Sequence, residues 1–131
     1  MATFKGIAPI FPTADFDAMR AHYEALGFTV RVHGGGYGTV GREGVQIHFR
    51  HVPSGSSGTG SPEQDAGRDP GATYIAVDDV DALQAEWRAA GVGETTKVFD
   101  PGFGVREAAH VDVDGNLIRF GSSAGASAAA S

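Results

Sequence analysis

One stretch of this chain occurs twice, and the repeat constrains the fold more than any other feature of the sequence. Residues 15–28 align without a gap on residues 79–92, with six of fourteen positions identical. In both copies large apolar residues occur at positions i, i+3 and i+7, which places them on one face of a helix. Each copy begins with an aspartate suited to an N-cap and ends at a glycine suited to the turn after a helix. We therefore expect two equivalent amphipathic helices.

Short stretches typical of β-strands flank both predicted helices in the same order. One stretch precedes each helix and three follow it. They cover residues 6–11, 29–33, 37–41 and 45–52 in the first half, and residues 72–77, 95–98, 106–111 and 116–121 in the second. The sequence therefore predicts an α+β fold in which a βαβββ module occurs twice, over about 4–52 and 71–121.

Two further segments contain few large apolar residues. Residues 53–70 are rich in Gly, Ser, Pro and Asp, and residues 122–131 are nearly all Ser, Ala and Gly. Such segments bury too little apolar surface to offset the entropy of ordering them. We expect a loop that joins the two modules, with a role as a lid left open, and a disordered tail. Residues 1–121 then form a single domain, as a chain of this length permits.

The composition excludes several classes of protein. There is no cysteine among the 131 residues, which rules out disulfide scaffolds, zinc-thiolate folds and thiol catalysis. Ten basic against sixteen acidic residues give a net charge of −6, which disfavours nucleic acid as a partner. No apolar run approaches the length of a membrane span, and the first residues do not resemble a signal peptide. We expect a soluble cytoplasmic protein with no membrane partner.

Alternation within the predicted strands assigns side chains to faces of the sheet. Val45, Ile47 and Phe49 form an apolar set that we expect to pack on a helix. The opposite face presents polar and aromatic side chains: Gln46, His48, Arg50, Tyr74 and Arg119. Such a face either lies in water or lines a concave site, and the alternation alone leaves both readings open.

The duplicated module and two local motifs resemble the vicinal oxygen chelate superfamily, which includes glyoxalase I, extradiol dioxygenases, fosfomycin-modifying enzymes and bleomycin resistance proteins. Residues 23–28 (YEALGF) are similar to the family's FYxxLGF helix end, and residues 112–118 (DVDGNLI) to its DPDGNxI turn and last strand. Val113 stands where the family usually has proline. The resemblance implies a cup-shaped mixed β-sheet with the helices outside.

The same resemblance bears on metal binding. Enzymes of the superfamily hold a divalent metal with four side chains, and the corresponding positions here are Ala8, His48, Ala72 and Arg119. Two methyl groups and a guanidinium cannot coordinate a cation, so we expect no metal and no cofactor. The alternative is a relocated metal site in a lyase, isomerase or dioxygenase of the same superfamily. Its candidate ligands are His48, His51, Glu107, His110 and Asp112.

Residues 7–10 (IAPI) and 37–45 (YGTVGREGV) resemble bleomycin resistance proteins in particular. In that branch a proline matching Pro9 is associated with exchange of the N-terminal strand between two subunits. Aromatic side chains at the dimer interface stack there on the flat heteroaromatic tail of the drug. The resemblance implies a strand-swapped homodimer with these ligand-binding residues: Tyr37, His48, Arg50, Tyr74, Phe99, Phe103, Glu107 and Arg119.

The function that follows is that of a binding protein with no catalytic residues, which confers antibiotic resistance by sequestering a bleomycin-type glycopeptide or a similar planar aromatic natural product. The acidic net charge favours the cationic tail of such a drug, whereas Arg50 and Arg119 favour carboxylate, carbonyl or sulfate groups. Other readings stay open: the relocated-metal enzyme, a metal-free enzyme with Glu107 as base and Arg119 as electrophilic partner, and a ligand-sensing module.

Overall fold

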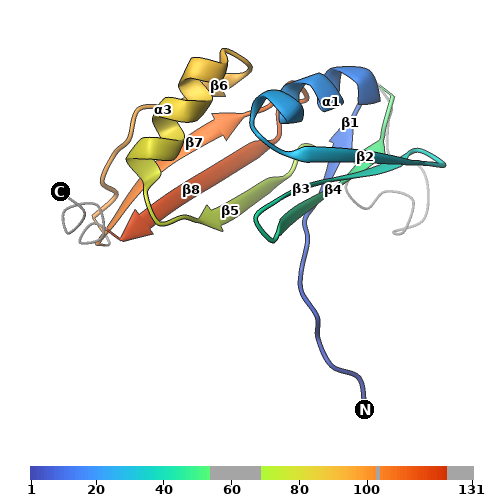
Figure 1. Cartoon of the computed structure of the whole chain (residues 1–131), viewed down its shortest axis with the longest axis horizontal. Helices are drawn as coiled ribbons and strands as arrows, with labels where there is room; N and C mark the ends of the chain where they lie inside the picture. The colour runs from blue at the N-terminus through green and yellow to red at the C-terminus, as the bar shows by residue number, and fades with distance from the viewer. Residues whose placement is uncertain (54–68, 103, 124–131) are drawn as a thin grey trace.

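The computed structural model describes residues 1–53, 69–102 and 104–123, and in these residues the two modules have the same order of elements (Figure 1). The first module consists of β1 (Ile10–Thr13), α1 (Phe16–Ala25), β2 (Thr29–Gly34), β3 (Tyr37–Arg42) and β4 (Val45–His51). The second consists of β5 (Ala72–Ala76), α3 (Val80–Ala90), β6 (Glu94–Thr95), β7 (Val105–Val111) and β8 (Leu117–Ser123). The predicted α+β class is confirmed, and most of the predicted loop, Phe103 and residues 124–131 of the predicted tail lie outside the described residues.

Both helices begin and end where the repeat predicted. The Asp15 carboxylate accepts hydrogen bonds from the N–H groups of Asp17 and Ala18 at 2.8 and 3.4 Å, and the Asp79 carboxylate accepts one from Ala82 at 3.0 Å. Gly91 follows α3 in the left-handed region with φ 72°, which glycine adopts at no steric cost. The caps explain why both helices have nearly the same length. Among the described residues no helix is long and apolar enough to cross a membrane.

The strands form two four-stranded mixed sheets with identical topology. The order is β1-β4-β3-β2 in the first sheet and β5-β8-β7-β6 in the second, and in each the first pair is parallel and the others antiparallel. Ile10 lies opposite His48, and Tyr74 lies opposite Arg119. Ile10 and Tyr74 are as far apart in the sequence as the two copies of the helix repeat. The duplication therefore extends to the pairing of the strands.

One hydrophobic core spans both modules. Figure 1 shows α1 and α3 on the same side of the two sheets. Trp87 of α3 packs against Phe28 and Phe120, with ring centroids 6.3 and 5.0 Å apart, and its indole N–H donates to the Leu26 carbonyl at 3.1 Å. The buried apolar residues come from both halves of the chain: Phe11, Met19, Tyr23, Leu26, Phe28, Val30, Val40, Ile47, Phe49, Val80, Trp87, Ala108, Ile118 and Phe120. Their burial fixes the modules beside one another.

The first strand differs from its prediction. It begins at Ile10 rather than at residue 6, and residues 1–9 run away from the body of the chain as an extended arm (Figure 1). Pro9 lacks the N–H that a ladder would use, although its carbonyl accepts from the His48 N–H at 2.9 Å. Phe4 and Ile7 are 102 and 98% exposed. The arm finds no apolar surface to pack on within the described part of its own chain.

Two other boundaries also differ. The predicted strand 95–98 is reduced to Glu94–Thr95, because the Thr96 hydroxyl accepts the Ala109 N–H at 2.9 Å and pairing resumes only at a Phe99–Glu107 bridge. Residues 122–123, which we assigned to the tail, belong to β8. Ser122 is buried, and its hydroxyl accepts from the Val80 N–H at the start of α3.

A buried polar cluster joins the modules through the turn after β7. The Asp112 carboxylate accepts from the Tyr23 hydroxyl at 2.6 Å and from the Asn116 side-chain amide at 3.0 Å. Asn116 also donates to the Pro12 carbonyl at 3.0 Å, and the Asp114 carboxylate accepts the Ala14 N–H at 2.9 Å. The turn therefore supports the fold by satisfying polar groups of the first module.

We expect the Asp112→Ala variant to lose about 2–4 kcal/mol of unfolding free energy, because it leaves the Tyr23 hydroxyl and Asn116 without their acceptor in the core. Urea unfolding followed by circular dichroism measures this. The matched control is Asp17→Ala on the exposed face of α1, which should change stability by at most about 0.5 kcal/mol. Equal effects of the two substitutions would contradict the structural role of the turn.

Candidate functional site

Four polar or aromatic side chains share the open face of the first sheet, opposite its buried residues. Tyr37 of β3 lies opposite Arg50 of β4, and Gln46 and His48 alternate along β4 with the buried Ile47 and Phe49. We call the set Tyr37, Gln46, His48 and Arg50 the first half-site. The alternation predicted from the sequence is confirmed for this strand.

A short hydrogen-bonded chain fixes the imidazole in the first half-site. The Tyr37 hydroxyl lies 2.5 Å from His48 Nδ1, and His48 Nε2 lies 3.1 Å from Gln46 Oε1. All three groups are satisfied when the phenol donates to Nδ1 and the imidazole N–H donates to the amide oxygen. The phenol and the amide therefore fix the orientation of the His48 imidazole beside an aromatic ring.

The open face of the second sheet carries the second half-site, which consists of Tyr74, Phe99, Glu107 and Arg119. Tyr74 lies directly opposite Arg119, and Phe99 forms a bridge with Glu107. The Arg119 guanidinium donates to the Glu107 carboxylate at 2.5 Å. Glu107 is buried at 7% exposure, whereas Tyr74 and Phe99 are 49 and 43% exposed. This face combines exposed aromatic rings with an anchored charge pair.

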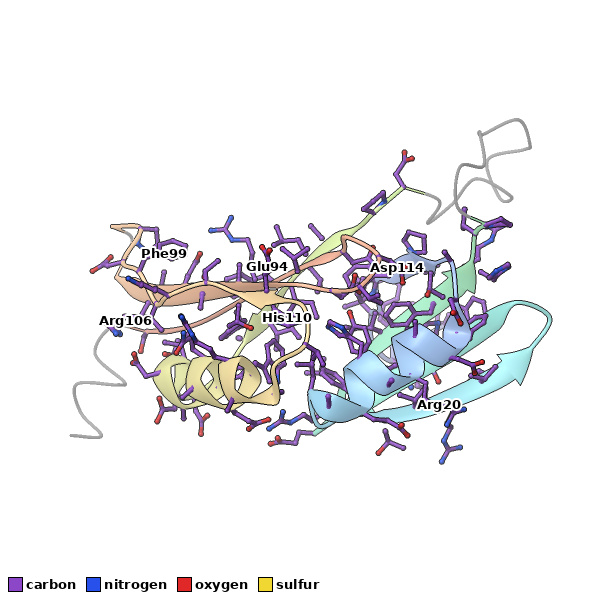
Figure 2. The ribbon with its side chains drawn as sticks, turned by 90° about the horizontal axis from the view of Figure 1, so that it is seen from above. Arg20, Glu94, Phe99, Arg106, His110 and Asp114 are labelled. Carbon is purple, nitrogen blue, oxygen red and sulfur yellow. The ribbon has the colours of Figure 1, made fainter. Side chains whose placement is uncertain are left out.

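The structure thus brings the described ligand-binding candidates together in two groups rather than one, while Phe103 lies outside the described residues. In the part of the chain that the structure describes, the two sheets share no hydrogen-bonded strand pair. Figure 2 shows Phe99 at the end of the second module that is far from α1, and the label of Arg20 marks α1. A cavity of about 380 Å³ does open between the modules, and its lining includes Phe28, Arg42, Val45, Leu83 and Glu86. None of the ligand-binding candidates that the structure describes belongs to that lining. In a single chain the two half-sites are open surfaces.

A buried histidine pair, which the sequence predicts only in part, lies between the modules. His22 Nε2 and His110 Nε2 are 2.8 Å apart, and His110 Nδ1 lies 2.8 Å from the Thr95 hydroxyl. Figure 2 shows His110 at the centre of the molecule. On the sequence alone His110 is named only as a candidate ligand of a relocated metal, and His22 is not singled out. The signal was available, because His22 adjoins Met19 and Tyr23 on the apolar face of the first helix.

Burial sets the protonation of this pair. Burial and the neighbouring His22 imidazole lower the pKa of His110 from 6.5 to about 4, against the opposing attraction of Asp112. Burial also lowers the pKa of His22, and the carboxylates of Asp112 and Asp114 oppose that shift. Both rings are neutral at pH 7, and one N–H is shared between the two Nε2 atoms.

The candidate ligands of a relocated metal are engaged in hydrogen bonds to other residues. His110 is bonded to His22 and Thr95, Asp112 to Tyr23 and Asn116, and the His51 ring to the Ala14 carbonyl. Within residues 1–53, 69–102 and 104–123 there is no group of three or more His, Asp or Glu side chains placed to hold a metal ion.

Comparison with known families gives a match over residues 6–120, to the model described as the glyoxalase/bleomycin resistance protein/dioxygenase superfamily. The chain belongs to this superfamily. Comparison with curated protein sequences gives no match. The matched residues span both modules, as the internal repeat requires.

Solved structures of the superfamily include binding proteins and an enzyme relative. The chain is similar to the bleomycin resistance determinant encoded on the transposon Tn5, with 24% identity, a TM-score of 0.74 and coverage of 92% of this chain and 98% of that one. It is similar to the bleomycin-binding protein of bleomycin-producing Streptomyces verticillus, solved with copper(II)-bleomycin, with 25% identity, a TM-score of 0.69 and 92 and 97% coverage. A glyoxalase-related enzyme from Clostridium phytofermentans shares 18% identity, with a TM-score of 0.70 and 93 and 97% coverage.

The positions at which superfamily enzymes bind metal do not fit a metal here. The register places Ile10 beside His48 and Tyr74 beside Arg119, while Ala8 and Ala72 lie two residues earlier. With Ala8 and Ala72 the set offers only the His48 imidazole, and with Ile10 and Tyr74 it offers that imidazole and one phenol, which is fewer ligands than a catalytic metal site uses. These positions therefore support no metal-dependent step.

We expect the stability of the protein to fall as the pH falls from 6.5 to about 4. Unfolded His110 takes up a proton below pH 6.5, whereas the folded side chain remains neutral until about pH 4, so acid favours the unfolded state by about 3 kcal/mol at the end of this range. The His110→Gln variant should flatten this part of the stability–pH curve measured by urea unfolding. His33→Gln, on the exposed end of β2, is the control and should leave the slope unchanged. Identical slopes for wild type and His110→Gln would refute the assignment.

Proposed function

We propose that the protein is a homodimeric, metal-free binding protein that confers resistance by sequestering a bleomycin-type glycopeptide or a similar planar aromatic natural product. The observation that carries the proposal is the pair of open half-sites, whose exposed rings and hydrogen-bonding groups suit a flat polar ligand. The likeness to structures of bleomycin-binding proteins supports it. Affinity and slow release are then the whole mechanism.

The N-terminal arm supports a dimer. Phe4 and Ile7 are almost fully exposed in one chain, and large apolar side chains gain about 1.5–3 kcal/mol each on burial. A second copy of the chain is the occupant that covers them when the arm crosses to it. Pro9 lies where the arm leaves β1, a place that tolerates a residue without an N–H.

A dimer also closes the site. If the first half-site of one chain faces the second half-site of its partner, Tyr37 and Tyr74 lie on opposite walls of one crevice. The two-fold axis of a homodimer makes two such crevices, identical by symmetry. A flat ligand between aromatic walls gains about 0.5–1.5 kcal/mol per ring pair beyond the burial of its surface.

The second candidate is an enzyme of the same superfamily, and the likeness to a glyoxalase-related enzyme favours it. Its chemistry would use the His48 imidazole and the Glu107–Arg119 pair, or a metal held by other residues. Metal analysis of the purified protein, with an activity lost on chelation and restored by Mn²⁺, Fe²⁺ or Zn²⁺, would establish that function in place of sequestration.

Native mass spectrometry with metal-free bleomycin tests the proposal. We expect a dimer that binds two drug molecules in the absence of added metal. Tyr37→Ala should weaken binding about tenfold or more because it removes a ring and the partner of His48, whereas Arg20→Ala on the outer face of α1 should have no effect.

The same spectra test the role of the arm. The double variant Phe4→Ser, Ile7→Ser should shift the population toward monomer, while Val113→Ser, at an exposed apolar residue of a turn, should not. Sequestration would be refuted if no member of a panel of planar natural products bound, or if binding required an added divalent ion.

A further inference from the structure

Tyr74 does not point away from its sheet. Its hydroxyl lies so close to Gly121 that a Cβ added there would overlap it. Gly121 lies on β8, two residues beyond Arg119, the residue directly opposite Tyr74. The Tyr74 side chain therefore crosses from β5 onto β8 and lies along the surface of the sheet. About half of it, 49%, remains exposed.

The glycine at position 121 is explained by space rather than by backbone conformation. Gly121 does not belong to the glycines with positive φ, so its backbone is accessible to any residue. A side chain there would meet the Tyr74 hydroxyl, the Arg106 carbonyl and the Glu107 side chain. The absence of a side chain at Gly121 thus leaves room for the Tyr74 hydroxyl, and we call this close contact the seat of Tyr74.

Arg119 is anchored next to this ring. One oxygen of the buried Glu107 carboxylate accepts a hydrogen bond from Arg119 Nη2 at 2.5 Å, and the Arg119 side chain is 48% exposed. This bond uses one of the five N–H donors of the guanidinium. Among the described residues it is the one ion pair of Arg119, so further donors stay available beside Tyr74. Anchoring reduces the side-chain entropy that Arg119 loses when it binds a ligand.

We propose that Tyr74, seated on Gly121, and Arg119, anchored by Glu107, form a subsite that selects a flat aromatic ring bearing a carboxylate or a similar anionic group. This inference rests on the proposed function and names the ligand class of the same site. The ring of the ligand stacks on Tyr74, and its carboxylate pairs with the exposed edge of the guanidinium. The planar guanidinium of arginine suits this pairing better than the point charge of a lysine ammonium.

The selectivity opposes the net charge of the protein. At −6 the chain attracts cations at long range, but screening limits this to about 8 Å at physiological salt. Contact with the guanidinium acts within hydrogen-bonding distance and is not screened in the same way. The subsite therefore favours an anionic ring even on an acidic protein.

Isothermal titration of the full chain with 2-naphthoate and its neutral analogue 2-naphthamide tests the proposal. We expect 2-naphthoate to bind at least ten times more tightly. Arg119→Gln should remove this preference while leaving the affinity for 2-naphthamide unchanged, and Tyr74→Leu should weaken both probes at least fivefold. The matched control is Arg106→Gln, since Arg106 is on the same strand as Glu107 but pairs with Asp81 of α3. It should alter neither affinity.

Equal affinities for the two probes in wild type, or a loss of both in Arg119→Gln, would overturn the inference. Parallel titration with metal-free bleomycin separates this failure from that of the proposed function. If bleomycin binds but 2-naphthoate shows no preference, sequestration stands and the anionic subsite is wrong. If neither the drug nor the probes bind, both are wrong.

Discussion

The shared core between the two modules is the constraint on which the rest of the structure depends. Trp87 packs against Phe28 of the first module and donates to the Leu26 carbonyl, so neither half of the chain buries its apolar face alone. The bidentate pair between Arg42 and Glu86, at 2.7 and 3.0 Å, adds a second link near the surface. Because both helices cover the same side of the sheets, neither helix covers the polar faces (Figure 1). The open half-sites are thus a direct consequence of how the core is formed.

The uncovered faces explain why the polar residues of the two half-sites do not line the cavity between the modules in the part of the chain that the structure describes. His48 is held by Tyr37 on one sheet, and Arg119 is held by Glu107 on the other. Each group is ordered by contacts within its own sheet before any ligand arrives. Such preorganisation lowers the entropy lost on binding, and it is compatible with a ligand that bridges two chains.

The sequence predicted the elements whose determinants are local. The aspartate caps, the glycines after the helices and the alternation along β4 depend on residues close together in the chain, and each prediction of this kind is confirmed. The predictions that were wrong depend on distant partners. Residues 6–9 do not form a strand, since the described part of the chain offers their apolar side chains no surface to pack on, and Ser122 joins β8 because Val80 donates to it. The His22–His110 contact joins residues 88 apart, which no spacing rule reveals.

The sheet faces on which the candidate residues lie were predictable, but the arrangement of those faces was not. Alternation placed His48, Tyr74 and Arg119 on polar faces, as the structure does. Whether the two faces meet depends on the packing of the modules and on a second chain, which the alternation does not specify. The seat of Tyr74 on Gly121 likewise needs the register of β5 and β8.

The central claim, that a binding crevice combines the first half-site of one chain with the second half-site of its partner, is tested most directly with mixed dimers. Tyr37→Ala chains and Tyr74→Ala chains are each expected to form homodimers with two defective crevices. A heterodimer of the two has one crevice made of both intact half-sites, so mixing the chains should restore wild-type affinity for metal-free bleomycin at one site per dimer. If the mixed dimers bind no better than either homodimer, the half-sites do not combine across the interface.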